Sequence, residues 1–289
     1  MGSDQQIPDR SAGDRRNTTE VFTVFLKLGL TSFGGPIAHL GYFRKEFVEQ
    51  RQWVNDGQFA QLLAICQLLP GPASSQLGFC LGLLRGGWIG ALAAFFAFTL
   101  PSALLLFLFA LIAPQLSGPI GQAVIHGLKL VALVVVAHGL LGMTGKLCTD
   151  IRRRAIAVFV AALLLVGGGV WLQISVIFLG AFFGFFLLRN DKDLPDSPLL
   201  PGYGRKTGSA LLAIFLILLV CLPLFVQGSN SCLDFFAAFY RAGALVFGGG
   251  HVVLPFLEQA LVDPGWLSRN DFMAGYGAAQ AVPGPMFSL

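Results

Sequence analysis

Hydrophobic residues occupy this chain in long runs that short polar segments separate. No Lys, Arg, Asp or Glu occurs between Arg85 and Lys129, from Ala155 to Leu188, or between Lys206 and Asp234. Each of these stretches exceeds the roughly 20 apolar residues that cross a bilayer core. The pattern predicts an all-α polytopic membrane protein with apolar segments at 21–40, 58–84, 88–113, 120–144, 155–170, 172–188, 208–227, 235–254 and 271–289.

The polar segments divide the chain into parts. The stretch 155–188 would reach about 50 Å as one helix, against a hydrocarbon core of about 30 Å, so its three glycines at 167–169 predict a helical hairpin. Residues 189–206 contain three prolines and form the long polar connection. We therefore expect a polar cytoplasmic N-terminus at 1–20, a first half at 21–188, a cytoplasmic linker at 189–206, and the start of a second half at 207–289.

An internal repeat relates the two halves. The sequence FLKLGLTSFGGP near the N-terminus has a second copy, FYRAGALVFGGG, and QLLPGP has a second copy, QAVPGP. One residue of gap aligns the whole block, which indicates a duplication. The matched pairs are Lys27 and Arg241, Gly29 and Gly243, Trp53 and Trp266, and Gln67 and Gln280.

The distribution of Lys and Arg predicts opposite orientations for the two copies. The basic loops 145–154 and 189–206 should be cytoplasmic, and so should Arg85. The turns near 114–118, 167–173 and 227–234 carry no Lys or Arg and should be external. The loop 41–57 has balanced charges and stays undecided. An odd number of spans then separates the copies, as in the inverted repeats of many secondary transporters.

The second copy stops early by comparison with the first. The first half continues for 116 residues beyond Pro72, whereas the chain ends four residues after Pro285. We expect the sequence to be a truncated gene product or a piece of a longer protein.

The repeated glycine and proline motifs should interrupt helices within the membrane. Phe33-Gly34-Gly35-Pro36 and Pro70-Gly71-Pro72 lie in apolar sequence, where an unpaired backbone group is tolerated only inside protein or beside a wet cavity. A half-helix would begin behind each break and present free amides, which attract anions. Those amides belong to Ile37, Ala38, His39, Ala73, Ser74 and Ser75, and the two serines add hydroxyl groups. The alternative is that these motifs only kink helices for packing.

Other candidate residues have two interpretations each. Lys27 and Arg241 either supply positive charge to an anion or extend to the interface. Lys129 has the same two interpretations. His39 and His251 either couple proton movement or pack as polar core groups. Trp53 and Trp266 are most simply interfacial anchors, and the cysteines in apolar runs are small packing residues.

Composition narrows the function classes. The chain is 55% hydrophobic and 12% charged, against about 25% charged in soluble domains. Its net charge of +4 comes from basic loops, so we expect no nucleic-acid partner. The sequence carries no catalytic motif, no metal-ligand spacing and no ATP site, so we expect neither enzyme activity nor a cofactor or metal. Transport would then use an ion gradient or the membrane potential.

The motifs SFGGPIAHLGYFRKEFV, QLLPGPASSQLG, FGGGHVVLPFLE and QAVPGP resemble those of the chromate ion transporter family, over roughly residues 21–289. The resemblance implies chromate export, chromate resistance and a bacterial plasma (inner) membrane. With the cations and serines above, it completes a predicted substrate-binding set. Its motif residues are Phe33, Gly34, Gly35, Pro36, His39, Gln67, Pro70, Gly71, Pro72, Phe247, Gly248, Gly249, His251, Gln280, Pro283, Gly284 and Pro285.

Three alternatives stay open. Sulfate shares the shape and charge of chromate, so backbone amides, hydroxyls and cations would suit either ion. The same arrangement of half-helices would also suit an anion channel, and a membrane-embedded enzyme is the most remote alternative. Membrane lipid is the expected surrounding, and homodimer formation is undecided.

Overall fold

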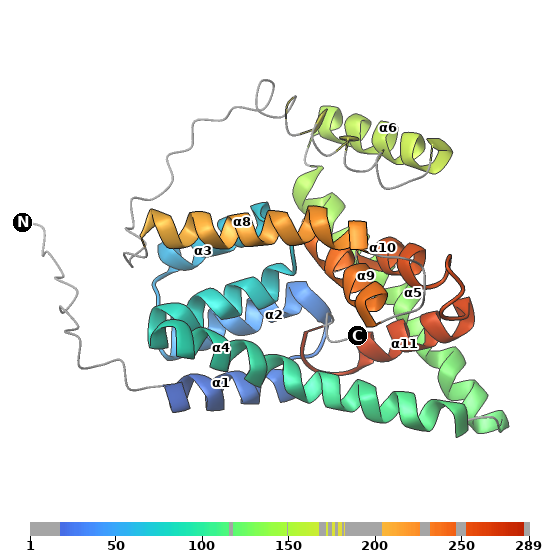
Figure 1. Ribbon diagram of the computed structural model, residues 1–289, viewed down its shortest axis with the longest axis horizontal. Coiled ribbons are helices and arrows are strands. Elements are labelled where there is room, and N and C mark those ends of the chain that lie inside the picture. The colour runs from blue at the N-terminus through green and yellow to red at the C-terminus, as the bar shows by residue number, and fades with distance from the viewer. Residues whose placement is uncertain are drawn as a thin grey trace, which may run out of the picture. The chain divides into compact units, whose positions relative to one another are not determined.

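The computed structural model describes residues 18–115, 118–148, 150–167, 172, 175–176, 179–180, 182, 204–225, 232–246 and 253–285 (Figure 1). These residues form helices and no strands, in agreement with the predicted all-α class. The chain divides into two compact units. One combines residues 1–131 with 197–289, and the other comprises residues 132–196.

The first half of the larger unit consists of helices that end or begin at the predicted breaks. Helix α1 spans Thr18–Thr31 and α2 spans Gly35–Arg44, continuing as a π-helix, η1, over Lys45–Gln50. Helix α3 covers Asp56–Leu68, and α4 covers Ala73–Ile112. The expected loop at 41–57 was wrong in its extent, because helical structure continues to Gln50 and leaves only a short connection before α3.

An aromatic cluster forms the core between α1, α2–η1 and α4. The Phe25 ring lies 5.0 Å from the Phe47 ring and 5.7 Å from the Phe43 ring, and Phe43 lies 5.2 Å from Phe98. All four side chains are buried. Burying a phenylalanine side chain contributes about 1.5–3 kcal/mol, so this cluster is a main reason that α2 folds back against α1 and α4.

Helix α4 reverses direction at Gly87. This glycine has φ 63° and ψ −156°, which lies outside helical geometry. A Cβ atom on Gly82 would lie 2.6 Å from the Gly90 carbonyl oxygen and 2.7 Å from the Ala94 Cβ. Residues eight and twelve positions apart meet in this way only if the chain folds back, so α4 has a first arm before Gly87 and a second arm after it.

The remaining helices complete the two units. In the larger unit, the 3-10 turn η2 (Ala113–Gln115) precedes α5 (Pro119–Leu147), which continues into the smaller unit. The smaller unit also contains α6 (Ile151–Gly167); its predicted glycine turn lies outside the described residues beyond Gly167. The second half of the larger unit contains α8 (Arg205–Cys221), η3 (Leu222–Phe225), α9 (Cys232–Ala244), α10 (Val253–Leu261) and α11 (Arg269–Ala281).

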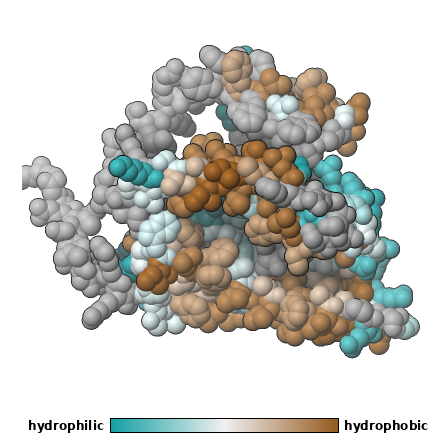
Figure 2. Space-filling view, in the orientation of Figure 1, coloured by the Kyte–Doolittle hydropathy of each residue, from teal (hydrophilic) through white to brown (hydrophobic). Residues whose placement is uncertain are grey.

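Within the described part of the chain, two helical stretches are long and apolar enough to cross a membrane, namely Ala73–Ile112 and Lys206–Leu224. Within the first, the second arm of α4 alone has 25 residues after Gly87, or about 37 Å of helix. Leu104, Phe107 and Leu111 on this arm are exposed. Figure 2 shows hydrophobic side chains gathered over α8 and along α4, as expected of surfaces that face lipid.

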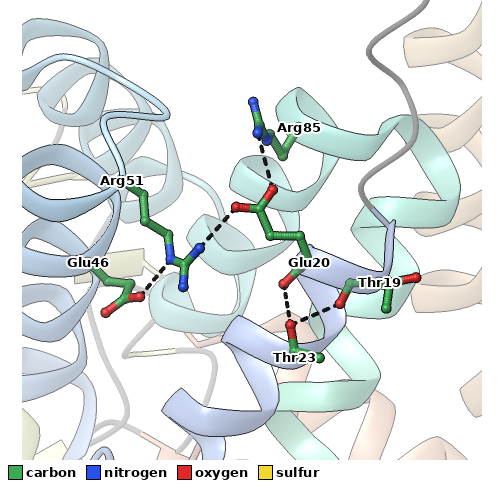
Figure 3. A network of polar contacts seen from close by, with 6 residues as sticks. All are labelled: Thr19, Glu20, Thr23, Glu46, Arg51 and Arg85. Atoms are coloured by element: carbon green, nitrogen blue, oxygen red, sulfur yellow. Dashed lines mark hydrogen bonds and ion pairs between the residues drawn. The ribbon is translucent and has the colours of Figure 1, made fainter.

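Charged residues join the ends of the first-half helices that lie away from the breaks (Figure 3). The Glu20 carboxylate at the start of α1 accepts from Arg51 at 2.9 Å and from Arg85 at 3.1 Å. Arg51 also donates to Glu46 at 2.7 Å. The Arg85 guanidinium lies 5.4 Å from the centre of the Trp53 ring. One end of α1, the end of η1 and the turn of α4 are therefore held together.

Because the two arms of α4 approach closely at Gly82, a side chain added there should destabilise the protein. The variant Gly82→Val should lower the melting temperature of the detergent-solubilised protein by several degrees, because a side chain there collides with backbone and overpacking costs about 1–3 kcal/mol. The matched control is Gly208→Ala, since nothing lies within 4 Å of that Cβ position. Equal melting temperatures for wild type and Gly82→Val would contradict the reversal at Gly87.

Candidate functional site

The first break lies between α1 and α2 and depends on two glycines with left-handed backbone. Gly34 has φ 97° and Gly35 has φ 75°, values that side chains disfavour. Helix α2 begins at Gly35, and Pro36 lies in its first turn, as the sequence predicted. Because Gly34 is the N-cap, α-helical bonding engages the amides of Ala38 and His39. Of the three predicted amides, that of Ile37 is left as a first-turn donor.

The second break lies between α3 and α4. Gly71 has φ 120°, and α4 begins at Ala73, directly after Pro72. The Gln76 side chain donates from Nε2 to the Pro70 carbonyl at 2.7 Å, which fixes the shape of the break. Sequence reasoning missed Gln76, because a glutamine in an apolar run gives no sign of which carbonyl it will meet.

Two backbone hydrogen bonds connect the breaks of the two halves. The Gly71 amide donates to the Val246 carbonyl at 2.7 Å, and the Gly284 amide donates to the Ser32 carbonyl at 3.0 Å. Ser32 and Val246 each directly precede the Phe-Gly-Gly of their own half. Each Pro-Gly-Pro motif is therefore bonded to the residue that directly precedes the other half's Phe-Gly-Gly.

The first turn of α4 is a set of buried donors. Ala73, Ser74 and Ser75 are all buried. Among the described residues, no hydrogen-bond acceptor is recorded for their three amides, whereas the Gln76 amide bonds to the Pro72 carbonyl. The positive end of the helix dipole adds to these donors. This arrangement is suited to binding a small anion.

His39 lies in α2, one turn after the first break. Its ring is fully buried, and Nε2 lies 3.2 Å from the Ser32 carbonyl oxygen. Because a carbonyl only accepts, Nε2 must carry the proton. The ring also packs edge-on against Phe98, with 5.4 Å between centroids. Within the described part of the chain, Nδ1 has no hydrogen-bond partner. His39 therefore holds the same carbonyl that receives the Gly284 amide.

Other predicted residues lie at different levels of exposure. Lys27 and Arg241 are exposed on α1 and α9, and Phe33 is 51% exposed at the first break. The matched glutamines differ, since Gln67 is exposed and Gln280 is buried near Gly35. Phe247, Gly248, Gly249 and His251 lie outside the described residues. The binding roles of this whole set stay predictions.

Ser102 of α4 lies beside the second Pro-Gly-Pro, which the bond from Gly284 to Ser32 holds against the first half. A Cβ on Gly284, which has φ 100°, would lie 3.0 Å from the Ser102 Oγ and 3.1 Å from the Gly29 carbonyl oxygen. The buried Ser102 hydroxyl donates to the Thr99 carbonyl at 2.9 Å. Gly284 is thus required twice, for its backbone angle and for the absence of a side chain. No motif in the sequence pointed to Ser102.

An ion pair of reversed polarity occurs at equivalent places in the two halves. In the first half, Arg44 donates to Asp56 at 2.8 Å and to Glu49 at 2.6 Å. In the second, Arg269 donates to Glu258 at 2.7 Å. The hydrogen bond from Arg44 to Asp56, together with the charges of both carboxylates, raises the pKa of the Arg44 guanidinium.

Comparison with known proteins now adds to this geometry. Residues 19–185 and 233–289 match the chromate transporter family. A chromate transport protein of Pseudomonas aeruginosa is 28% identical over 92% of this chain and 64% of its own length. A "Probable chromate transport protein" of Synechococcus elongatus is 32% identical over 91% of this chain and 65% of its own length. No solved structure matches.

A third relative, the chromate transport protein of Cupriavidus metallidurans, is 29% identical over 97% of this chain and 69% of its own length. The chain thus spans about two thirds of the length of these curated relatives. The family comprises membrane-embedded transporters and not enzymes, in agreement with the apolar helices of the fold. By the match over residues 19–185 and 233–289, the chain belongs to the chromate transporter family.

Proposed function

We propose that this protein is a secondary transporter that exports chromate from the cytoplasm across a bacterial plasma membrane and so confers chromate resistance. The observation that carries the proposal is the reciprocal pair of bonds from Gly71 to Val246 and from Gly284 to Ser32. It joins each Pro-Gly-Pro break to the residue directly before the Phe-Gly-Gly of the other half. Export direction and resistance extend the family relationship, and the geometry does not bear on them.

The arrangement supports two inverted copies of one unit. Helix α3 begins three residues after Trp53, and α11 begins three residues after Trp266. Each of these helices has 13 residues and ends two residues before its Pro-Gly-Pro. A rotation that exchanges the halves would also exchange the two backbone hydrogen bonds that join them. A two-fold axis in the membrane plane has this property and is common among secondary transporters.

The distance from the charged network supports a site near the middle of the membrane. Charged groups are costly in hydrocarbon, so the Glu20 network should lie at the membrane surface. Helix α1 runs 11 residues from Glu20 to Thr31, or about 16 Å. The first arm of α4 extends over a similar distance between Arg85 and Ala73. Half of a core about 30 Å thick is about 15 Å, so both breaks reach the midplane.

The donor set supports an oxyanion as substrate. Chromate is a tetrahedral dianion, and the amides of Ala73, Ser74 and Ser75 would contact its oxygens at the positive end of α4. Sulfate has the same shape and charge, so a sulfate or other oxyanion carrier is the second candidate. An anion channel is the third, because a filter made of helix ends does not itself require alternating access.

Uptake into inverted membrane vesicles tests the substrate. Vesicles that contain this chain should accumulate radiolabelled chromate against its gradient when a proton or sodium gradient is imposed, and unlabelled sulfate should compete. Vesicles without the protein are the control. Movement of sulfate alone would contradict the chromate assignment, and flux that only follows the membrane potential to equilibrium would indicate a channel.

The two matched cations give a second prediction. The variants Lys27→Gln and Arg241→Gln should each lower chromate flux about tenfold or more, because each removes a positive charge from the anion's route. Flux is measured in vesicles at equal protein content. The control is Lys206→Gln, an exposed residue of α8 that lies outside the predicted set. Wild-type flux in both cation variants would contradict their role.

Cysteine labelling from each side of the membrane tests the orientation. Single cysteines introduced at 146 and 206 should react with an impermeant reagent from the cytoplasmic side, because both loops are rich in Lys and Arg. A cysteine at 52 should react from the same side, since Arg51 is bonded to Glu20 and near Arg85. Reaction of these three sites from the external side would refute the inverted arrangement.

A further inference from the structure

Helix α1 has a polar strip on its exposed side. Thr19, Thr23, Lys27 and Thr31 follow one another at intervals of four, and all four are exposed. At about 100° per residue they fall within an arc of about 120°. The buried side of the helix carries Val21, Val24, Phe25 and Leu28, and the exposed, apolar Leu30 falls within the arc of the strip. A third sector carries the exposed Phe22.

The strip runs from the charged network to the first break. Glu20, which accepts from Arg51 and Arg85, marks its outer end, and Thr31 directly precedes Ser32 at its inner end. Lys27 lies seven residues inward from Glu20, or about 10 Å. The strip therefore connects the charged network to the first break, where the Ser32 carbonyl accepts from Gly284.

The charge of Lys27 indicates the environment that the strip faces. The hydroxyl groups of Thr23 and Thr31 donate to carbonyls one turn earlier, at 3.0 Å and 2.7 Å, so hydrocarbon would tolerate them. An ammonium group is different, because a charge exposed to lipid at this depth costs several kcal/mol. The Lys27 ammonium has no acidic or hydrogen-bonding partner among the described residues. Wet surroundings would remove this cost, whereas extension to the interface would have to cover about 10 Å along the helix.

We propose that the polar strip of α1 lines a water-filled path, along which the oxyanion reaches the breaks from the cytoplasmic side. This inference rests on the proposed function and adds the route of access. Lys27 supplies an attractive charge along the path, and the threonine oxygens keep its wall wettable. The aromatic side chain of Phe33, 51% exposed at the inner end, separates the path from the site.

The second half lacks this strip, although it shares the cation. The equivalent positions on α9 are Leu233, Ala237, Arg241 and Leu245. Ala237 is buried, and Leu233 is exposed and apolar. Arg241 is therefore the only polar member of its series. The wetted route belongs to the first half, which explains why the two repeats are not interchangeable.

Cysteine reactivity along α1 tests the path without any measurement of transport. In a chain whose five native cysteines are alanine, Thr23→Cys and Thr31→Cys should react with an impermeant anionic thiosulfonate added to the cytoplasmic side of inverted vesicles. Phe22→Cys, on the lipid sector, should react at least tenfold more slowly. Gel filtration of each variant confirms that it is folded before rates are compared.

The charge of Lys27 gives the decisive comparison. At Thr23→Cys, the ratio of the rates with anionic and cationic reagents should fall about tenfold when Lys27→Gln is added, since two charges about 6 Å apart interact appreciably even in water. Adding Arg241→Gln instead should leave the ratio unchanged. Equal rates at positions 22, 23 and 31 would overturn the path. So would oxidative cross-linking of two copies through Lys27→Cys, which would place the strip in a dimer contact.

The two proposals fail separately. If the labelling pattern holds and chromate does not move in the vesicle experiment, the path stands for another anion and the chromate assignment is wrong. If chromate moves and the strip is unreactive, the transporter stands and its route of access lies on another surface.

Discussion

A helix that stops inside a membrane leaves amides and carbonyls that water cannot reach, and this constraint organises the larger unit. Lipid offers no hydrogen bond, so the amides and carbonyls at each helix interruption must find their partners within the protein. Here the interruptions satisfy each other: Gly71 donates to Val246, and Gly284 donates to Ser32. Neither half could bury its breaks alone, because the acceptor for each glycine amide belongs to the other half.

The same constraint explains the glycines and the histidine. Gly34, Gly35, Gly71 and Gly284 all have positive φ, so the chain turns sharply enough at each break for the two halves to approach. His39 adds a second donor to the Ser32 carbonyl and is held by Phe98. The bond from Gly284 to Ser32 is thus supported by a residue of the aromatic core. This contact couples the stability of the first half to the geometry of the site.

Much of this could be predicted from the sequence, because apolar length and helix breakers act locally. The all-α class and the starts of α2 and α4 followed from runs of hydrophobic residues and from Pro-Gly motifs. The crossing bonds could not be predicted, because Ser32 and Val246 contribute carbonyl groups that every residue has. Helix was also missed across 41–50, where Phe43 and Phe47 bury themselves beside charged neighbours and tertiary packing outweighs a polar local composition.

The differences between the halves are as informative about function as the residues that they share. In the proposed inverted arrangement, each copy of the duplicated unit meets different charges and solutes on its side of the membrane, so equivalent residues are free to diverge. Arg44 with Asp56 has become Glu258 with Arg269, which preserves the attraction and exchanges the polarity. The threonines of α1 have become leucine and alanine on α9, while Lys27 and Arg241 keep their charge. What both halves retain is the cation and the breaks, as expected if these act on the solute itself. In the proposed route of access, only the first half retains the polar side chains that lead to the breaks.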